Sequence, residues 1–116
     1  MKTKELTNVP GLEPTDIVVI KKLGYGSLNK LRGNTTNTNI NTQTQKMDVN
    51  MNLGEYMKWL VVFGIHKAPF FDKCKDENDK ARVIDNDEIE ANTGEYIYKE
   101  IEAFNGFAGV DEVKKN

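Results

Sequence analysis

The chain has few of the residues on which catalytic and metal sites most often depend. Its 116 residues include one cysteine, Cys74, and one histidine, His66. A single cysteine excludes an internal disulfide. Zinc would need carboxylates for its remaining ligands, and no spacing in the chain suggests such a site. His66 is expected near the end of a helix, either as a cap for the last carbonyls or in a simple surface position. The chain has no second histidine for a catalytic triad. We therefore expect no catalytic, metal or cofactor-binding residues and no enzyme.

The chain also has no strong excess of one charge and no long apolar run. Its formal net charge is −2, so no global field attracts it to nucleic acid or anionic lipid. The longest apolar run, Leu60 to Phe63, is far shorter than the roughly 20 residues that span a bilayer. The first ten residues lack the apolar region of a signal peptide. We expect a protein of the cytoplasm.

Three short motifs resemble functional sites but do not meet their requirements. Gly24-Tyr25-Gly26 lacks the preceding strand, third glycine and following acid of a dinucleotide site, and it is interpreted as a helix stop. The acidic segments that begin at Asp72 and Asp76 place the wrong residues at the glycine and final glutamate positions of a calcium loop. Cys74 lies among charged residues and is interpreted as an exposed thiol in a reduced compartment.

The length predicts one domain. We expect a flexible leader over residues 1–12, a compact domain over 13–110 and a frayed tail over 111–116. A first helix is predicted from Glu13 to Leu23, because Pro14 suits a first turn and the apolar residues Ile17, Ile20 and Leu23 share a face. A short helical turn capped by Ser27 and ended by Gly33 follows.

A polar tract of low complexity follows from residue 34 to residue 45. It has too few apolar residues to order itself alone. Met47, Val49 and Met51 then alternate with polar residues, which predicts a half-buried strand. Two alternatives stay open: the tract is the partner strand of a hairpin, or it is a mobile arm that becomes ordered on binding.

The block from Leu53 to Phe71 is the most apolar part of the chain and contains its only tryptophan. A second helix is predicted from Gly54 to Lys67, with Asn52 and Glu55 at capping-box spacing and Ala68-Pro69 as its end. Apolar residues cover most of its circumference, which indicates burial by its own fold or by another subunit.

Residues 72–87 are strongly charged and predict a solvated surface segment. A third helix is expected to begin between Asp87 and Gly94, with Asn92 as its cap, and to end at Asn105-Gly106. The fold class is therefore α+β: a small, mainly helical domain with three main helices and a β-hairpin or strand arm around residues 35–52.

The candidate protein-binding residues are the large apolar residues of the second helix, the segment after it and the third helix. They are Met57, Trp59, Leu60, Phe63, Phe70, Phe71, Ile97 and Ile101. Methionine repacks readily against different partners, which suits a transient binding surface. The alternative is that these residues form only the core of the domain, since a chain this small needs most of its large apolar residues inside.

The order of the segments is also familiar. An apolar helix, DIVVIKKL, leads into GYGSLNKLRG, then come a polar stretch, a helix ending in GIHKAPFF, a charged spacer and the helix EYIYKEIEAFN. Over roughly Leu12 to Asn105 the chain resembles the short tail assembly chaperones of long-tailed bacteriophages and related prophages. The resemblance rests on the order of elements and on general sequence character.

The resemblance implies a non-enzymatic role. Such proteins bind the tape measure protein, recruit tail tube subunits and leave before the tail is complete, so the chain would act in the host cytoplasm and be absent from the virion. Many are made in two forms by a frameshift, for which an A-rich slippery run could encode Lys114-Lys115. A homo-oligomer remains an open alternative, and no membrane partner is expected.

Two other functions stay open from the sequence. The chain could be a permanent virion protein, such as a tail tube, terminator or connector subunit, whose polar arm joins a neighbour's sheet. It could also be a small regulator that binds nucleic acid through Lys21, Lys22, Lys30 and Arg32, although the acidic C-terminal half opposes this.

Overall fold

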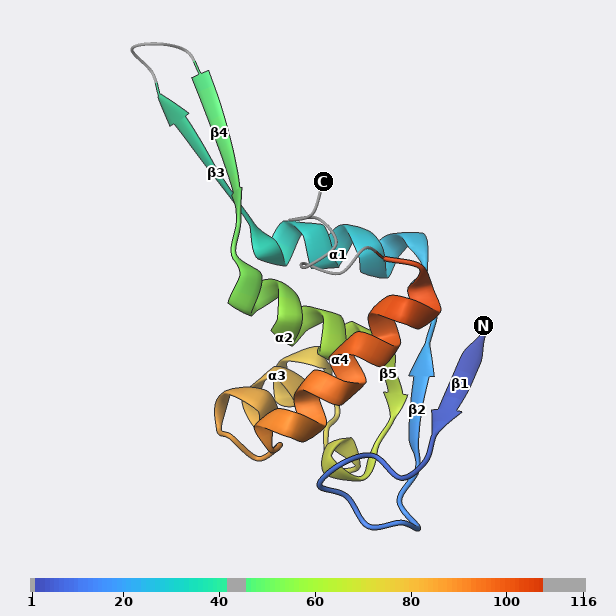
Figure 1. Cartoon of the computed structure of the whole chain (residues 1–116). Helices are drawn as coiled ribbons and strands as arrows, with labels where there is room; N and C mark the ends of the chain where they lie inside the picture. The colour runs from blue at the N-terminus through green and yellow to red at the C-terminus, as the bar shows by residue number, and fades with distance from the viewer. Residues whose placement is uncertain (1, 42–45, 108–116) are drawn as a thin grey trace.

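The computed structural model describes residues 2–41 and 46–107, with the backbone alone over 37–41 and 46–51. The described part confirms a small, mainly helical α+β domain, with four α-helices and a three-stranded antiparallel sheet (Figure 1). Its elements are β1 (Thr3–Leu6), β2 (Val18–Lys21), α1 (Tyr25–Thr35), β3 (Thr36–Asn41), β4 (Lys46–Met51), α2 (Leu53–Gly64), β5 (Ile65–Lys67), the 3-10 turn η1 (Pro69–Phe71), α3 (Glu77–Asp85) and α4 (Ala91–Asn105).

The expected flexible leader is instead part of the fold. Residues 3–6 form β1, which pairs antiparallel with β2 from Thr3 opposite Lys21 to Leu6 opposite Val18. Leu6 and Val9 are both buried. The prediction of a loose leader over residues 1–12 was wrong because two apolar residues were enough to anchor a short strand whose other residues are polar and exposed.

The helix predicted from Glu13 to Leu23 is also absent, because β2 occupies its centre. Val18 and Ile20 are fully buried while the residues between and after them are partly exposed, which is the period-two pattern of a strand. A short apolar run cannot be assigned to helix or strand by periodicity alone. The β-branched side chains of Val18, Val19 and Ile20 favour the strand.

Gly24-Tyr25-Gly26 starts a helix rather than ending one. Gly24 has an extended backbone at the N-cap, and α1 continues through Gly33 to Thr35. Leu31 is buried and Leu28 packs against the core, and α1 lies along α2 in Figure 1. Packing of these leucines therefore outweighs the poor helix propensity of the two glycines inside α1.

Replacing Gly33 with alanine is expected to stabilise the domain by about 0.5–1 kcal/mol, because alanine loses less backbone entropy in a helix. A β-carbon at position 33 would meet no atom within 4 Å. Urea denaturation of Gly33→Ala beside the parent chain measures the change. An unchanged or lower midpoint would show that residue 33 is not inside a helix.

The hairpin alternative for the polar tract is confirmed over the described residues. β3 and β4 pair antiparallel from Thr36 opposite Met51 to Asn41 opposite Lys46. The ribbon projects from the body of the domain, and Asn52 N–H donates to Thr35 C=O across its base at 2.8 Å (Figure 1). Residues 42–45, the rest of the predicted tract, lie outside the described part.

The second helix begins as predicted but ends earlier. The side chain of Asn52 accepts a hydrogen bond from Glu55 N–H at 3.1 Å, which confirms the capping prediction. The helix ends at Gly64, and β5 follows, with buried Ile65 opposite Ile20. His66 therefore lies exposed in a strand and does not cap the helix. Pairing with β2 ends α2 before Ala68-Pro69 is reached.

The charged segment contains a helix that the sequence analysis did not predict. Asp76 caps α3 by accepting from Asp79 N–H at 2.8 Å, and Ala81 is buried. The last helix, α4, has Glu90 rather than Asn92 at its N-cap. It ends as predicted at Gly106, which has the left-handed backbone of a helix C-cap. The expected tail, residues 111–116, lies outside the described part.

One polar residue fixes the end of α4 against the sheet. Asn105 accepts from Leu23 N–H at 2.8 Å and donates to Lys21 C=O at 3.3 Å. These bonds satisfy backbone groups just after β2, where the sheet ladder ends. Figure 1 shows α2 and α4 beside the sheet, and the buried residues of these elements form most of the core.

Candidate functional site

Five of the eight predicted binding residues belong to the core of the domain. Leu60, Ile97 and Ile101 are fully buried, and Phe63 and Phe71 are nearly so. In this conformation no partner can reach them, so the prediction that they form a contact surface was wrong and the core alternative is correct for these five. They hold α2, η1 and α4 together because their side chains exclude water from the helix and sheet interfaces.

The other three predicted residues, Met57, Trp59 and Phe70, are partly exposed. Trp59 stacks on Phe63 with ring centroids 5.6 Å apart, and Phe70 meets the Phe71 ring edge-on at 4.8 Å. Met57 alone of the eight lines an apolar groove between α2 and α4. The structure therefore does not bring the eight residues together into one surface.

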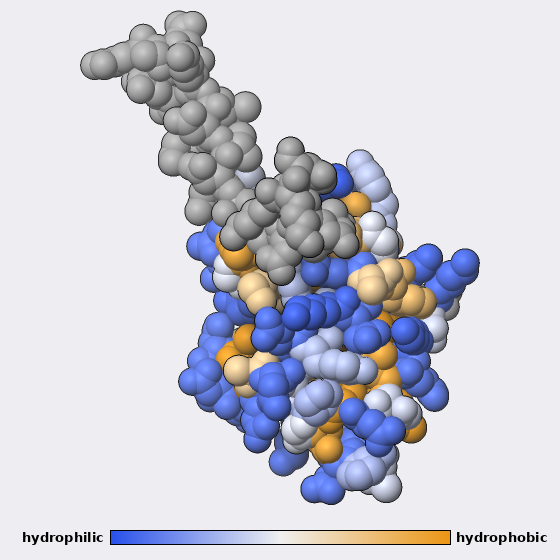
Figure 2. Space-filling view, in the orientation of Figure 1, coloured by the Kyte–Doolittle hydropathy of each residue, from blue (hydrophilic) through white to orange (hydrophobic). Residues whose placement is uncertain are grey.

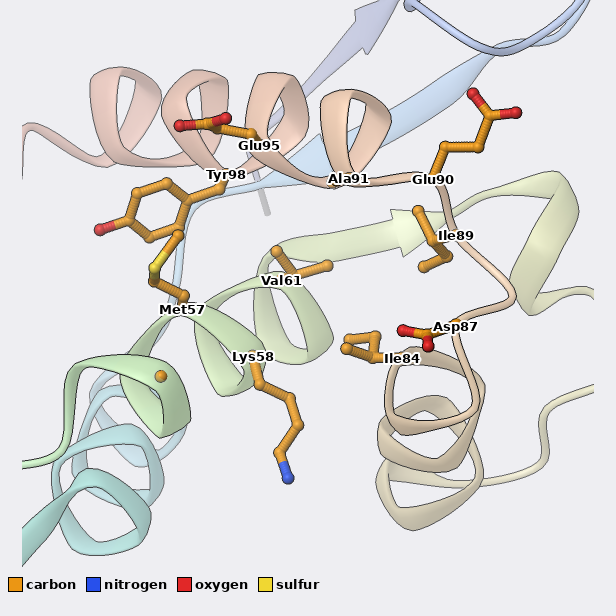
Figure 3. Close-up of a pocket in the computed structure, with 12 residues that line it drawn as sticks. Met57, Lys58, Val61, Ile84, Asp87, Ile89, Glu90, Ala91, Glu95 and Tyr98 are labelled. Carbon is orange, nitrogen blue, oxygen red and sulfur yellow. The ribbon is translucent and has the colours of Figure 1, made fainter.

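This groove lies between α2, α4 and the connection from α3 to α4, and its volume is about 420 Å³. Figure 3 shows Val61 at its centre, Met57 and Tyr98 at one end, and Ile84 and Ile89 at the other. We call it the α2–α4 groove. Its large apolar residues are partly buried or buried, so they give the groove an apolar floor without forming a broad exposed patch.

The charged residues of the α2–α4 groove are mainly acidic. Its lining includes the carboxylates of Asp87, Glu90 and Glu95 against one ammonium, that of Lys58. In Figure 3 the Asp87 carboxylate lies beside Ile84, while the Glu90 and Glu95 side chains extend outward from the α4 side. The groove therefore combines an apolar floor with a negative border.

A hydrogen-bonded cluster on α2 neutralises Lys58. Its ammonium lies 3.3 Å from the Glu55 carboxylate and 3.4 Å from that of Asp85. Glu55 also accepts a hydrogen bond from the Trp59 indole N–H at 2.9 Å. The Lys58 ammonium lies 5.3 Å from the centre of the Trp59 ring, within the range of a cation–π contact. Lys58 is thus already paired and leaves the border of the groove negative.

Two tyrosines next to the groove are held in their protonated form. Tyr56 of α2 meets Tyr98 of α4 edge-on, with ring centroids 6.1 Å apart. Burial, followed by the charge of Glu102 and a hydrogen bond with it, raises the pKa of Tyr56 to about 12. Burial and the charge of Glu102 raise the pKa of Tyr98 as well. Their raised pKa values mean that these phenols offer no base at neutral pH.

The part of the chain that the structure describes contains no cluster of three His, Cys, Asp or Glu residues able to hold a metal ion. Over the same residues, no helix has the length and apolar character needed to cross a membrane. Burial and neighbouring carboxylates raise the pKa of Cys74, which makes its thiol a weaker nucleophile.

A second surface carries a different charge. Lys2, Lys21 and Lys22 line a shallow depression at the start of α1. Lys22 lies over the Phe104 ring at 5.6 Å. This arrangement includes two of the four basic residues predicted for a nucleic-acid contact, whereas Lys30 pairs with Glu77 at 3.6 Å.

The sequence analysis missed the far wall of the α2–α4 groove. Ile84 and Ile89 come from a segment interpreted as solvated surface and from the start of the last helix. The available signal was Val83-Ile84, the only strongly apolar pair between residues 72 and 87. The face shown in Figure 2 is mostly hydrophilic, with apolar residues in small separate areas.

Comparison of the chain with protein-family models, with curated proteins and with solved structures found no match.

Proposed function

We propose that this chain is a non-enzymatic phage tail assembly chaperone that transiently binds the tape measure protein and recruits tail tube subunits. The observation that supports this best is the α2–α4 groove, an open apolar trough with a negatively charged border. The order of sequence segments resembles the same class of proteins.

The groove suits a partner that must be released. Its apolar contacts are limited to a few side chains, and Met57 at one end can change rotamer to fit different partners. Charged groups at the border make such a contact sensitive to salt and to competing interfaces. A permanent interface of a folded subunit is larger and more apolar.

Co-expression tests the chaperone function. A tape measure protein and a tube protein of a long-tailed phage, taken from the genes next to this one if they occur there, are co-expressed with this chain, and complexes are separated by size. We expect a soluble complex that contains this chain and the tape measure protein, and purified mature particles that lack this chain. Its presence in mature particles at the copy number of a ring would contradict the proposal.

A second candidate is a permanent virion subunit, and the β3–β4 ribbon favours it. A two-stranded ribbon is only marginally stable alone, and both of its edges lack a partner strand within the described residues. In a tail ring, a neighbouring subunit's sheet would extend it. Rings or tubes of the purified chain in electron micrographs would favour this candidate over the chaperone.

A further inference from the structure

The chemistry of the α2–α4 groove selects among the ways in which proteins recognise peptides. Its walls are helices and one connection, so it offers no strand edge for β-strand addition. The described residues that line it include no arginine, which recognition of a phosphorylated or acidic motif requires. They include one aromatic residue, the buried Tyr98, whereas recognition of a polyproline segment uses several. An apolar trough between helices is the usual site for the apolar face of another helix.

The charge of the border indicates which charge the bound helix carries. Asp87, Glu90 and Glu95 are exposed, and the only cation of the lining, Lys58, is already held by Glu55 and Asp85. Glu95 has a weak exposed partner in Lys99 at 3.9 Å, which screens it only in part. An acidic helix would therefore be repelled, whereas lysine or arginine beside an apolar stripe would be attracted.

We propose that the α2–α4 groove binds a basic amphipathic helix of the client protein. Apolar side chains at i, i+4 and i+7 of this helix would enter the trough above Val61 and between Met57 and Ile84, and its basic residues would face Asp87 and the border of α4. The proposal rests on the chaperone function proposed above and deepens it by giving the chemistry of the client segment.

Three synthetic peptides of about 18 residues, roughly five helical turns, test the proposal. One has a leucine stripe with lysines on the other faces, the second has the same stripe with glutamates, and the third has the composition of the first in an order without helical periodicity. Fluorescence anisotropy measures binding to the full chain at low and moderate salt. We expect the leucine–lysine peptide to bind at least about tenfold more tightly than the other two, and less tightly as salt increases.

Two sets of variants locate the binding site. Ala91 is exposed and lines the groove, so Ala91→Trp is expected to fill the trough and weaken binding of the leucine–lysine peptide about tenfold. Ala103→Trp is its matched control, since Ala103 is exposed on the same helix but outside the groove. Thermal melts of both variants verify that the fold is kept.

The charge contribution has its own matched pair. The triple variant Asp87→Asn, Glu90→Gln and Glu95→Gln removes the negative border. Asn at position 87 keeps the left-handed backbone that Asp87 adopts. The control removes three other exposed carboxylates, those of Glu5, Glu13 and Asp72. We expect only the first variant to lose most of the difference between the lysine and glutamate peptides.

Equal binding of the lysine and glutamate peptides, or unchanged binding by Ala91→Trp, would overturn the proposal. So would self-association of the chain that Ala91→Trp abolishes, because the groove would then hold a second copy. These outcomes are separate from those of the chaperone test. If the tape measure complex still forms with Ala91→Trp, the chaperone function stands but the tape measure protein binds elsewhere on the domain. If the leucine–lysine peptide binds specifically but no tape measure complex forms, the chaperone function is contradicted and the groove remains a binding site for a basic amphipathic helix.

Discussion

Replacing Leu60 with alanine is expected to lower the free energy of unfolding by about 2–5 kcal/mol, a large part of the stability of a small domain. Leu60 has no exposed surface, and it lies in the middle of α2, the helix that contacts α1, α3, α4 and β5. Truncation removes apolar contacts and leaves a cavity that the surrounding side chains fill only in part. Urea denaturation followed by circular dichroism measures the loss.

Met57→Ala is the matched control for Leu60→Ala. Met57 lies one turn before Leu60 on the same helix but is partly exposed and lines the α2–α4 groove. We expect a smaller loss of stability, about 1 kcal/mol, because less apolar area leaves contact with the protein. If Leu60→Ala kept the stability of the parent chain and only weakened partner binding, the assignment of Leu60 to the core would fail.

The near all-round apolarity of α2 has a cause within the domain. A helix on the surface of a small protein needs one apolar stripe, but α2 packs against three other helices and is followed directly by a strand of the sheet. At Gly64 the helices α2 and α4 approach so closely that a β-carbon there would lie 2.6 Å from Ile101 Cγ2 and 2.8 Å from its Cδ1. Most of the apolar surface that suggested a partner is therefore used by α1, α3, α4 and the sheet.

Local sequence chemistry predicted the features that depend on neighbouring residues. Asn52 caps α2 because its side-chain oxygen reaches Glu55 N–H, and Gly106 ends α4 because glycine adopts a positive φ without strain. The alternation of Met47, Val49 and Met51 indicated β4 correctly. These signals act over a few residues and do not depend on the rest of the fold.

The elements that the sequence did not predict depend on distant partners. β1 and β5 are short strands that exist because β2 lies between them, and α1 includes two glycines that only packing against α2 can offset. The groove depends on the same kind of contact. Met57 was named from its helix, but its distance from Ile84 and Ile89 follows from how α3 and α4 return to α2, which no local pattern encodes.

Replacing Gly11 with alanine is expected to lower the free energy of unfolding by about 2–4 kcal/mol, from left-handed backbone strain and from the loss of a buried hydrogen bond. Gly11 has a φ of 83°, and a β-carbon there would overlap the hydroxyl oxygen of Thr93. Thr93 is buried and donates this hydroxyl to Pro10 C=O at 2.5 Å, which joins the segment after β1 to the first turn of α4. Thermal and urea denaturation measure the effect.

Gly106→Ala isolates the contribution of that contact. Gly106 also has a positive φ, 72°, but a β-carbon there would meet no atom within 4 Å. Its replacement should therefore lower the free energy of unfolding by about 1–2 kcal/mol, from left-handed backbone strain alone. The excess loss in Gly11→Ala then measures how strongly Thr93 holds the N-terminal segment, and removal of both the hydroxyl and the overlap by Thr93→Ala should reduce the excess. Equal losses in the two glycine variants would mean that residues 1–12 contribute little to the fold, as the sequence alone had suggested.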